Sequence, residues 1–198
     1  MAQTARVFSN GAGCGGIDSN GRRAPQHLRD AYVAGLFAEI WEDHHRCEVR
    51  LVPALDQFPD AQLREASAPM DFEITIADKH DRRMFAEHRE WAEMLKRGQS
   101  PPVEDTKSRQ ESAREAIPRV CQEKVRRYFG APHSDGLVQA NLLVYVNLGA
   151  VLLPNEMVKL TEPWRKNFLS IWLLAGSDAV CTWPALQILK AVQDPFGD

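Results

Sequence analysis

Three carboxylates, Asp60, Asp71 and Glu73, gather around one short apolar segment. Carboxylate oxygens are the ligands that Mg²⁺ prefers, and a hard cation of this kind activates water and stabilises charge on phosphate oxygens. Asp71 and Glu73 are two residues apart, so on a β-strand they share a face and lie about 6–7 Å apart along it. Asp60 would reach the same ion from a neighbouring strand, and a strand carbonyl such as that of Ile74 would complete the shell. The spacing therefore indicates a site for Mg²⁺ or Mn²⁺.

The segment that carries Asp71 and Glu73 has the alternation of a β-strand. Over residues 70–77, one face is apolar and the other is polar: Phe72, Ile74 and Ile76 against Asp71, Glu73 and Thr75. Such alternation is typical of a half-buried strand. A hairpin at a sheet edge, with its polar face simply solvated, would give the same pattern. The alternation thus predicts the strand and leaves open whether its polar face binds a metal ion.

An acidic helix is predicted before this strand. The helix is predicted over residues 25–43, because apolar side chains recur there every four residues: Leu28, Tyr32, Leu36 and Ile40. Its C-terminal end carries Glu39, Glu42 and Asp43, an arrangement that is unfavourable for the helix dipole. We therefore take Glu39 and Glu42 as additional candidate metal ligands, with a solvated helix end as the alternative.

The rest of the chain alternates between predicted strands and helices. Strands are expected over residues 47–55, 62–65, 142–147, 169–175 and 179–183. Helices are expected over residues 82–97, 105–129, 161–167 and 184–192, with a kink or break at Pro118 in the longest. This order predicts an α/β domain over residues 25–198, with a single mixed β-sheet flanked by helices. The glycine-rich residues 1–24 are expected to form a flexible N-terminal arm.

Charge is distributed unevenly along the chain. Residues 30–78 contain three Lys or Arg and 11 Asp or Glu, a net charge of −8. Residues 79–130 contain 13 Lys or Arg and nine Asp or Glu, a net charge of +4. An acidic segment beside a basic one suits a metal site flanked by a phosphate-binding surface, although two differently solvated faces would carry the same charges. The candidate phosphate-binding side chains are Arg82, Arg83, Arg119, Lys124, Arg126 and Arg127, with Tyr128 available for stacking on a base.

Other chemistries lack their motifs in this sequence. There is no GxSxG, HExxH, GxxxxGK[ST] or CxxC pattern, and the GxGxxG over residues 11–16 lacks the flanking strand and helix of a dinucleotide site. The four cysteines lie far apart and no secretory pattern precedes them. No apolar run approaches the length of about 18 residues that a membrane span needs. We therefore expect a cytoplasmic protein with reduced thiols and no membrane partner, and leave homo-oligomer formation open.

The order of elements and the carboxylate spacing together resemble the PD-(D/E)XK nuclease superfamily, which has the restriction-endonuclease-like fold. The matching residues are Pro59-Asp60, then twelve residues, then Glu73-Ile74-Thr75. The resemblance implies that Asp60 and Glu73 bind Mg²⁺ or Mn²⁺, supported by Asp71 and by Glu39 or Glu42. It also implies a nuclease-like hydrolase that acts on phosphodiester bonds, with nucleic acid as the partner.

The sequence departs from that superfamily at Thr75, where the third motif position usually holds a lysine near the attacking water. Lys79 shares the face of Thr75 but lies about 13 Å further along an extended strand. Arg82 or Arg83 on the next predicted helix could supply the charge instead. The departure keeps two other functions open: an inactive module of the same fold used for protein association or regulation, and an unrelated α/β enzyme acting on small molecules.

Overall fold

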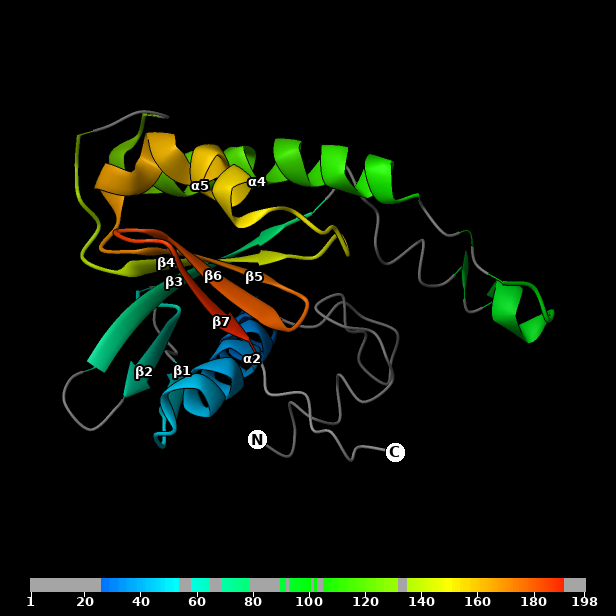
Figure 1. The fold of residues 1–198 in the computed structure, drawn as a ribbon, viewed down its shortest axis with the longest axis horizontal. Helices are drawn as coiled ribbons and strands as arrows, with labels where there is room; N and C mark the ends of the chain where they lie inside the picture. The colour runs from blue at the N-terminus through cyan, green and yellow to red at the C-terminus, as the bar shows by residue number, and fades with distance from the viewer. Residues whose placement is uncertain are drawn as a thin grey trace.

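The computed structural model describes residues 26–53, 58–64, 69–78, 90–91, 93–100, 102, 105–131 and 135–190. Seven strands form one curled mixed sheet in the order β1-β2-β3-β4-β5-β6-β7 (Figure 1). They are β1 (Arg50–Pro53), β2 (Ala61–Arg64), β3 (Pro69–Ala77), β4 (Asn141–Val146), β5 (Ile171–Ala175), β6 (Asp178–Trp183) and β7 (Gln187–Lys190). The predicted α/β class and single mixed sheet are confirmed.

The centre of the sheet is parallel and its outer pairs are antiparallel. β3 pairs with β4 and β4 with β5 in parallel, and every other neighbouring pair is antiparallel. A parallel connection needs a crossover, which α4 (Thr106–Phe129) supplies between β3 and β4. Between β4 and β5 the chain forms α5 (Pro154–Thr161) and the 3₁₀ helix η2 (Glu162–Asn167). In the register of β3 and β4, Glu73 lies opposite Leu142.

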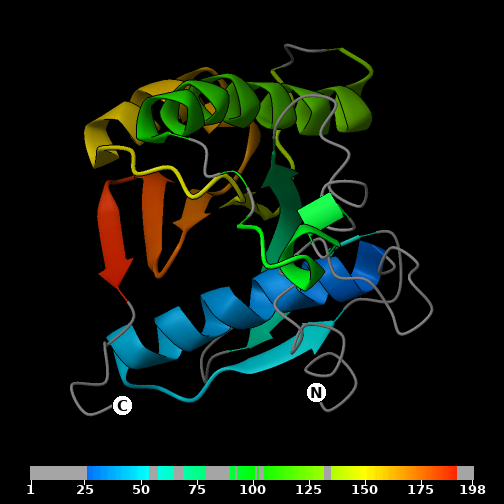
Figure 2. The ribbon, with the colours of Figure 1, turned by 90° about the vertical axis from the view of Figure 1, so that its right-hand side faces the viewer.

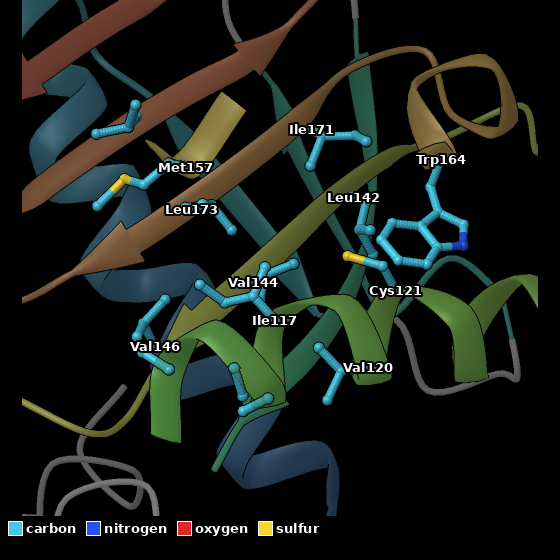
Figure 3. Close-up of a cluster of buried hydrophobic side chains, with 14 of the residues drawn as sticks. Ile117, Val120, Cys121, Leu142, Val144, Val146, Met157, Trp164, Ile171 and Leu173 are labelled. Atoms are coloured by element: carbon cyan, nitrogen blue, oxygen red, sulfur yellow. The ribbon is translucent and has the colours of Figure 1, made fainter. Parts of the chain in front are cut away.

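The sheet has a helical layer on each face. Figures 1 and 2 show α4 and α5 on one face and α2 (Gln26–His45) on the other. Between α4 and the sheet lies a cluster of buried apolar side chains, which includes Ile117, Val120, Cys121, Leu142, Val144 and Leu173 (Figure 3). On the other face, Phe37 of α2 packs against Phe72 of β3, with ring centroids 5.2 Å apart. Even-numbered residues of β3 therefore face α2 and odd-numbered ones face α4.

Helix α4 is uninterrupted over its 24 residues, so the break expected at Pro118 does not occur. Proline removes one amide donor, which in this helix costs the bond to the Arg114 carbonyl. Buried side chains on both sides of Pro118, those of Ile117 and Cys121, hold the helix against the sheet. Its first turn is capped by Asp105, whose Oδ1 accepts a hydrogen bond from the Ser108 amide at 3.0 Å.

The end of the described chain differs from the sequence prediction. Residues 184–192 were expected to form a helix, but residues 187–190 form β7, which pairs with β6 with Leu189 opposite Ala179. Only Leu189 is buried in this strand. The prediction is wrong because the edge of β6 offers hydrogen bonds to a short segment whose own apolar pattern is too weak to decide its structure. No element was predicted over residues 154–160, which form most of α5, and the predicted helix over residues 161–167 corresponds to the 3₁₀ helix η2.

Several predicted segments lie wholly or partly outside the described residues. The expected N-terminal arm over residues 1–24 is one of them. Of the expected helix over residues 82–97, residues 90–91 and 93–96 are helical and the others are not described, apart from a turn at residue 97. Among the described helices, none combines the length and the apolar character needed to cross a membrane.

Candidate metal site

Asp60 is placed beside β3 by the pairing of β2 with β3. The antiparallel ladder ends where Ala61 lies opposite Phe72, so the next amides of β3 need other acceptors. The Asp60 side chain meets this need, because its Oδ2 accepts a hydrogen bond from the Ile74 amide at 2.7 Å. The carboxylate is thereby fixed next to the middle of β3.

Glu73 lies on the same strand and points to the face covered by α4, as an odd-numbered residue of β3 should. Its exposed fraction is 1%, the lowest of any described acidic side chain. One of its oxygens, Oε1, is buried and accepts no hydrogen bond from the residues that the structure describes. A buried carboxylate is costly unless a cation or donors compensate it, so Glu73 requires a positive partner.

That partner is Lys124 of α4. Its Nζ lies 2.6 Å from Glu73 Oε2 and 2.9 Å from Asp60 Oδ2, and the side chain is 9% exposed. Two carboxylates that are distant in sequence thus converge on one ammonium group. The geometric prediction that Asp60 and Glu73 come together is confirmed.

Sequence reasoning placed Lys124 on a solvated, phosphate-binding helix face, which is wrong, because the residue is buried. The sequence contains a signal for the buried position of Lys124. Ile117, Cys121, Lys124 and Tyr128 recur at spacings of three and four residues, which is the spacing of the inward stripe of a helix. A lysine on that stripe must meet an acidic partner in the core.

Tyr128 lies one turn beyond Lys124 and closes the site on that side. Burial is the largest cause that raises the pKa of the Tyr128 phenol far above its ordinary value, followed by a hydrogen bond to the Glu73 side chain and by the charges of Glu73 and Asp60. Its ring also meets that of Phe58, edge to face, with centroids 6.1 Å apart. Phe58 is 42% exposed, so this aromatic pair reaches from the partly buried Tyr128 to the protein surface.

The other basic candidates lie in different surroundings. Arg119 Nη2 donates a hydrogen bond to the Asp78 carbonyl at 2.5 Å, so this side chain fastens α4 to the end of β3. Arg126 and Arg127, in the last turn of α4, are exposed. The remaining candidates, Lys79, Arg82 and Arg83, lie outside the described residues.

The structure does not bring Glu39 and Glu42 to Asp60 and Glu73. Both belong to α2, which covers the opposite face of the sheet. Glu42 Oε1 accepts a hydrogen bond from the Val49 amide at 2.6 Å, and Glu39 is exposed. Their acidity is therefore explained without a metal, and their assignment as additional ligands is corrected.

Asp71 and Thr75 lie on the same face of β3 as Glu73, and both are partly buried. Asp71 Oδ1 accepts a hydrogen bond from Gln62 Nε2 of β2 at 2.7 Å. Thr75 lies opposite Val144 in the register with β4. Neither side chain joins the contact made by Lys124.

The two carboxylates that meet at Lys124 are oxygen donors of the kind that Mg²⁺ and Mn²⁺ prefer. Among the described residues, no group of three or more His, Cys, Asp and Glu side chains comes together as a metal site. Mg²⁺ usually uses only one or two carboxylates and completes its octahedron with water and substrate phosphate. Asp60 and Glu73 supply two carboxylates, and the unpartnered Glu73 Oε1 is an acceptor that a cation could satisfy.

Comparisons with protein-family models, with curated proteins and with solved structures find no match to this chain.

Proposed function

We propose that this chain is a metal-dependent nuclease-like protein that acts on phosphodiester bonds of nucleic acid. The observation that carries the proposal is the convergence of Asp60, Glu73 and Lys124 at 2.6–2.9 Å. Two acidic ligands and one ammonium group suit metal-dependent phosphodiester hydrolysis, because negative charge develops on the phosphate oxygens and the leaving group as water attacks.

In this proposal Asp60 and Glu73 hold Mg²⁺ or Mn²⁺, which when bound supplies an activated water and charge stabilisation on the phosphate oxygens. Lys124 provides the positive charge that Thr75 lacks at the third motif position. It reaches the carboxylates from α4, across the interface between helix and sheet, whereas the resemblance expected a lysine on β3 itself. In this proposal the positive charge has the same chemical role but comes from helix α4 in place of strand β3.

The order of elements supports a restriction-endonuclease-like fold as part of the same proposal. α2 is followed by the antiparallel strands β1, β2 and β3, then by α4 and the parallel strand β4. The carboxylates lie where β2 begins and in the middle of β3, as the resemblance implies. The exposed Arg126 and Arg127, in the turn beyond Lys124, are the described side chains suited to contact the nucleic acid backbone.

The test is cleavage of single- and double-stranded DNA and RNA with Mg²⁺ or Mn²⁺ and with EDTA. Glu73→Gln should reduce cleavage at least about a hundredfold, because loss of a transition-state charge contact costs about 3–4 kcal/mol. The matched control is Glu123→Gln, an exposed glutamate on the same helix as Lys124. Equal activity of Glu73→Gln and the wild type, with folding intact, would exclude the catalytic role.

A second candidate function is a catalytically inactive module of this fold that serves protein association. The observation that favours it is the ion pair itself, since Lys124 already neutralises one of the two buried charges. This alternative predicts that neither Mg²⁺ nor Mn²⁺ binds at Asp60 and Glu73. Micromolar binding that is lost in Asp60→Asn would rule it out.

A further inference from the structure

The ammonium group of Lys124 stands between the two carboxylates at a position where a shared cation would stand. Its Nζ is bonded at once to Asp60 Oδ2 and to Glu73 Oε2. Asp60 Oδ2 also accepts the Ile74 amide, so this oxygen cannot turn away without breaking the contact that fixes it. A divalent ion that bridges the two carboxylates would therefore either replace Lys124 on these oxygens or lie directly beside its ammonium group, where the two positive charges repel each other.

We propose that Lys124 is a built-in competitor for the metal, and that a divalent ion binds to Asp60 and Glu73 only when Lys124 leaves at least one of them. This inference rests on the metal site of the proposed function, but it does not require that the protein cleaves nucleic acid. It assigns Lys124 two positions: on the carboxylates in the metal-free protein, and beside them in the metal-bound protein.

Burial indicates which contact opens first. The Asp60 side chain is 17% exposed and that of Glu73 only 1%, so the solvent side of the site is the Asp60 side. Lys124 has a flexible four-carbon stem, which lets its ammonium group move while its backbone stays in α4. A released Lys124 would remain next to the carboxylates, close to where a phosphate bound to the ion would lie. The same side chain would thus change from holding the empty site to contacting the substrate.

The decisive experiment is calorimetric titration of Mn²⁺ into the wild type and Lys124→Met. A competitor that occupies the site in nine molecules of ten weakens apparent affinity about tenfold, so Lys124→Met should bind Mn²⁺ at least about tenfold more tightly. Lys107→Met is the matched control, because Lys107 is on the same helix and 84% exposed, and it should bind like the wild type. Unchanged or weaker binding by Lys124→Met, or no binding by either protein, would overturn the inference.

A measurement on the wild type covers the case in which Lys124→Met does not fold. Amine-reactive labelling, followed residue by residue by mass spectrometry, should proceed severalfold faster at Lys124 with saturating Mn²⁺ than with EDTA. Labelling of Lys107 should not change, and Glu73→Gln should remove the effect of Mn²⁺ on Lys124. Identical Lys124 labelling with and without bound Mn²⁺ would contradict the exchange.

These outcomes separate the inference from the proposed function. Tighter Mn²⁺ binding by Lys124→Met without any cleavage by the wild type would support the competition and reject the nuclease activity. Cleavage that depends on Glu73, with Mn²⁺ affinity indifferent to Lys124, would support the nuclease and reject the competition.

Discussion

Lys124 Nζ lies 2.6 Å from Glu73 Oε2, and the two side chains are only 9% and 1% exposed. The contact joins residues 51 positions apart and links the C-terminal part of α4 to the centre of β3. It is therefore both a structural tie and the feature from which function is inferred.

Removal of the lysine charge should destabilise the metal-free protein. Lys124→Met leaves Asp60 and Glu73 facing each other with no cation, and a buried pair broken in this way costs about 3–5 kcal/mol. Urea denaturation in EDTA measures the loss, and Lys107→Met should stay within about 0.5 kcal/mol of the wild type. Adding Glu73→Gln to Lys124→Met should restore part of the stability, because one uncompensated charge is removed. A loss below about 1 kcal/mol would mean that the pair is not formed in solution.

Arg126 and Arg127 should contribute to nucleic acid affinity through phosphate contacts. In a Glu73→Gln background that prevents cleavage, replacement of both by Gln should weaken binding for every sequence alike. The slope of log affinity against log salt should fall by about 1 for each arginine that contacts a phosphate. Fluorescence anisotropy at several salt concentrations measures both effects. Lys107→Gln, at the far end of the same helix, is the control, and an unchanged salt slope in the double variant would place the binding surface elsewhere.

Gly136 should not accept a side chain. A Cβ at this position would collide with the Phe129 ring, whose Cζ would lie 2.6 Å away. Gly136→Ala should therefore lower the free energy of unfolding by about 1–3 kcal/mol, the usual cost of overpacking. Gly35→Ala is the opposite control, since nothing lies within 4 Å of its added Cβ and α2 should gain up to about 1 kcal/mol. Equal stability of Gly136→Ala and the wild type would mean that the loop after α4 is not packed as described.

Cys121 should be protected from thiol reagents in the folded protein. Cys121 belongs to α4 and is buried between this helix and the sheet, which raises the pKa of its thiol from 9.0 to about 12. The reactive thiolate is therefore scarce at pH 8. Mass spectrometry should show that Cys47, which is partly exposed, is modified before Cys121, and that Cys121 reacts only as fast as the protein unfolds. Rapid modification of Cys121 in native conditions would contradict the packing of α4 on the sheet.

Local patterns in the sequence were sufficient for the strand that carries the site. The alternation over residues 70–77 depends on neighbouring side chains alone, and β3 covers that span. The convergence of Asp60 with Glu73 also followed, because adjacent strands bring such residues together. The class of fold followed from the order of helices and strands, for the same local reasons.

The helical spacing of Lys124 with Ile117, Cys121 and Tyr128 indicates that Lys124 faces inward. Its partners could not be predicted, because they depend on how α4 is placed on the sheet. The prediction that Glu39 and Glu42 are metal ligands was wrong for the same kind of reason. Their position in the sequence does not determine which face of the sheet their helix covers. The helix predicted over residues 184–192 was wrong for a third reason. Pairing with the edge of β6 determines the structure of residues 187–190 more than their own side chains do.

A crystal structure of the protein with Mn²⁺, analysed by the anomalous scattering of the ion, tests the central claim most directly. The account predicts an ion bound to the carboxylates of both Asp60 and Glu73, at about 2.0–2.2 Å as for similar hard cations, with Lys124 Nζ moved off at least one of them. Absence of an ion there at saturating Mn²⁺, with Lys124 still bridging Asp60 and Glu73, would contradict it.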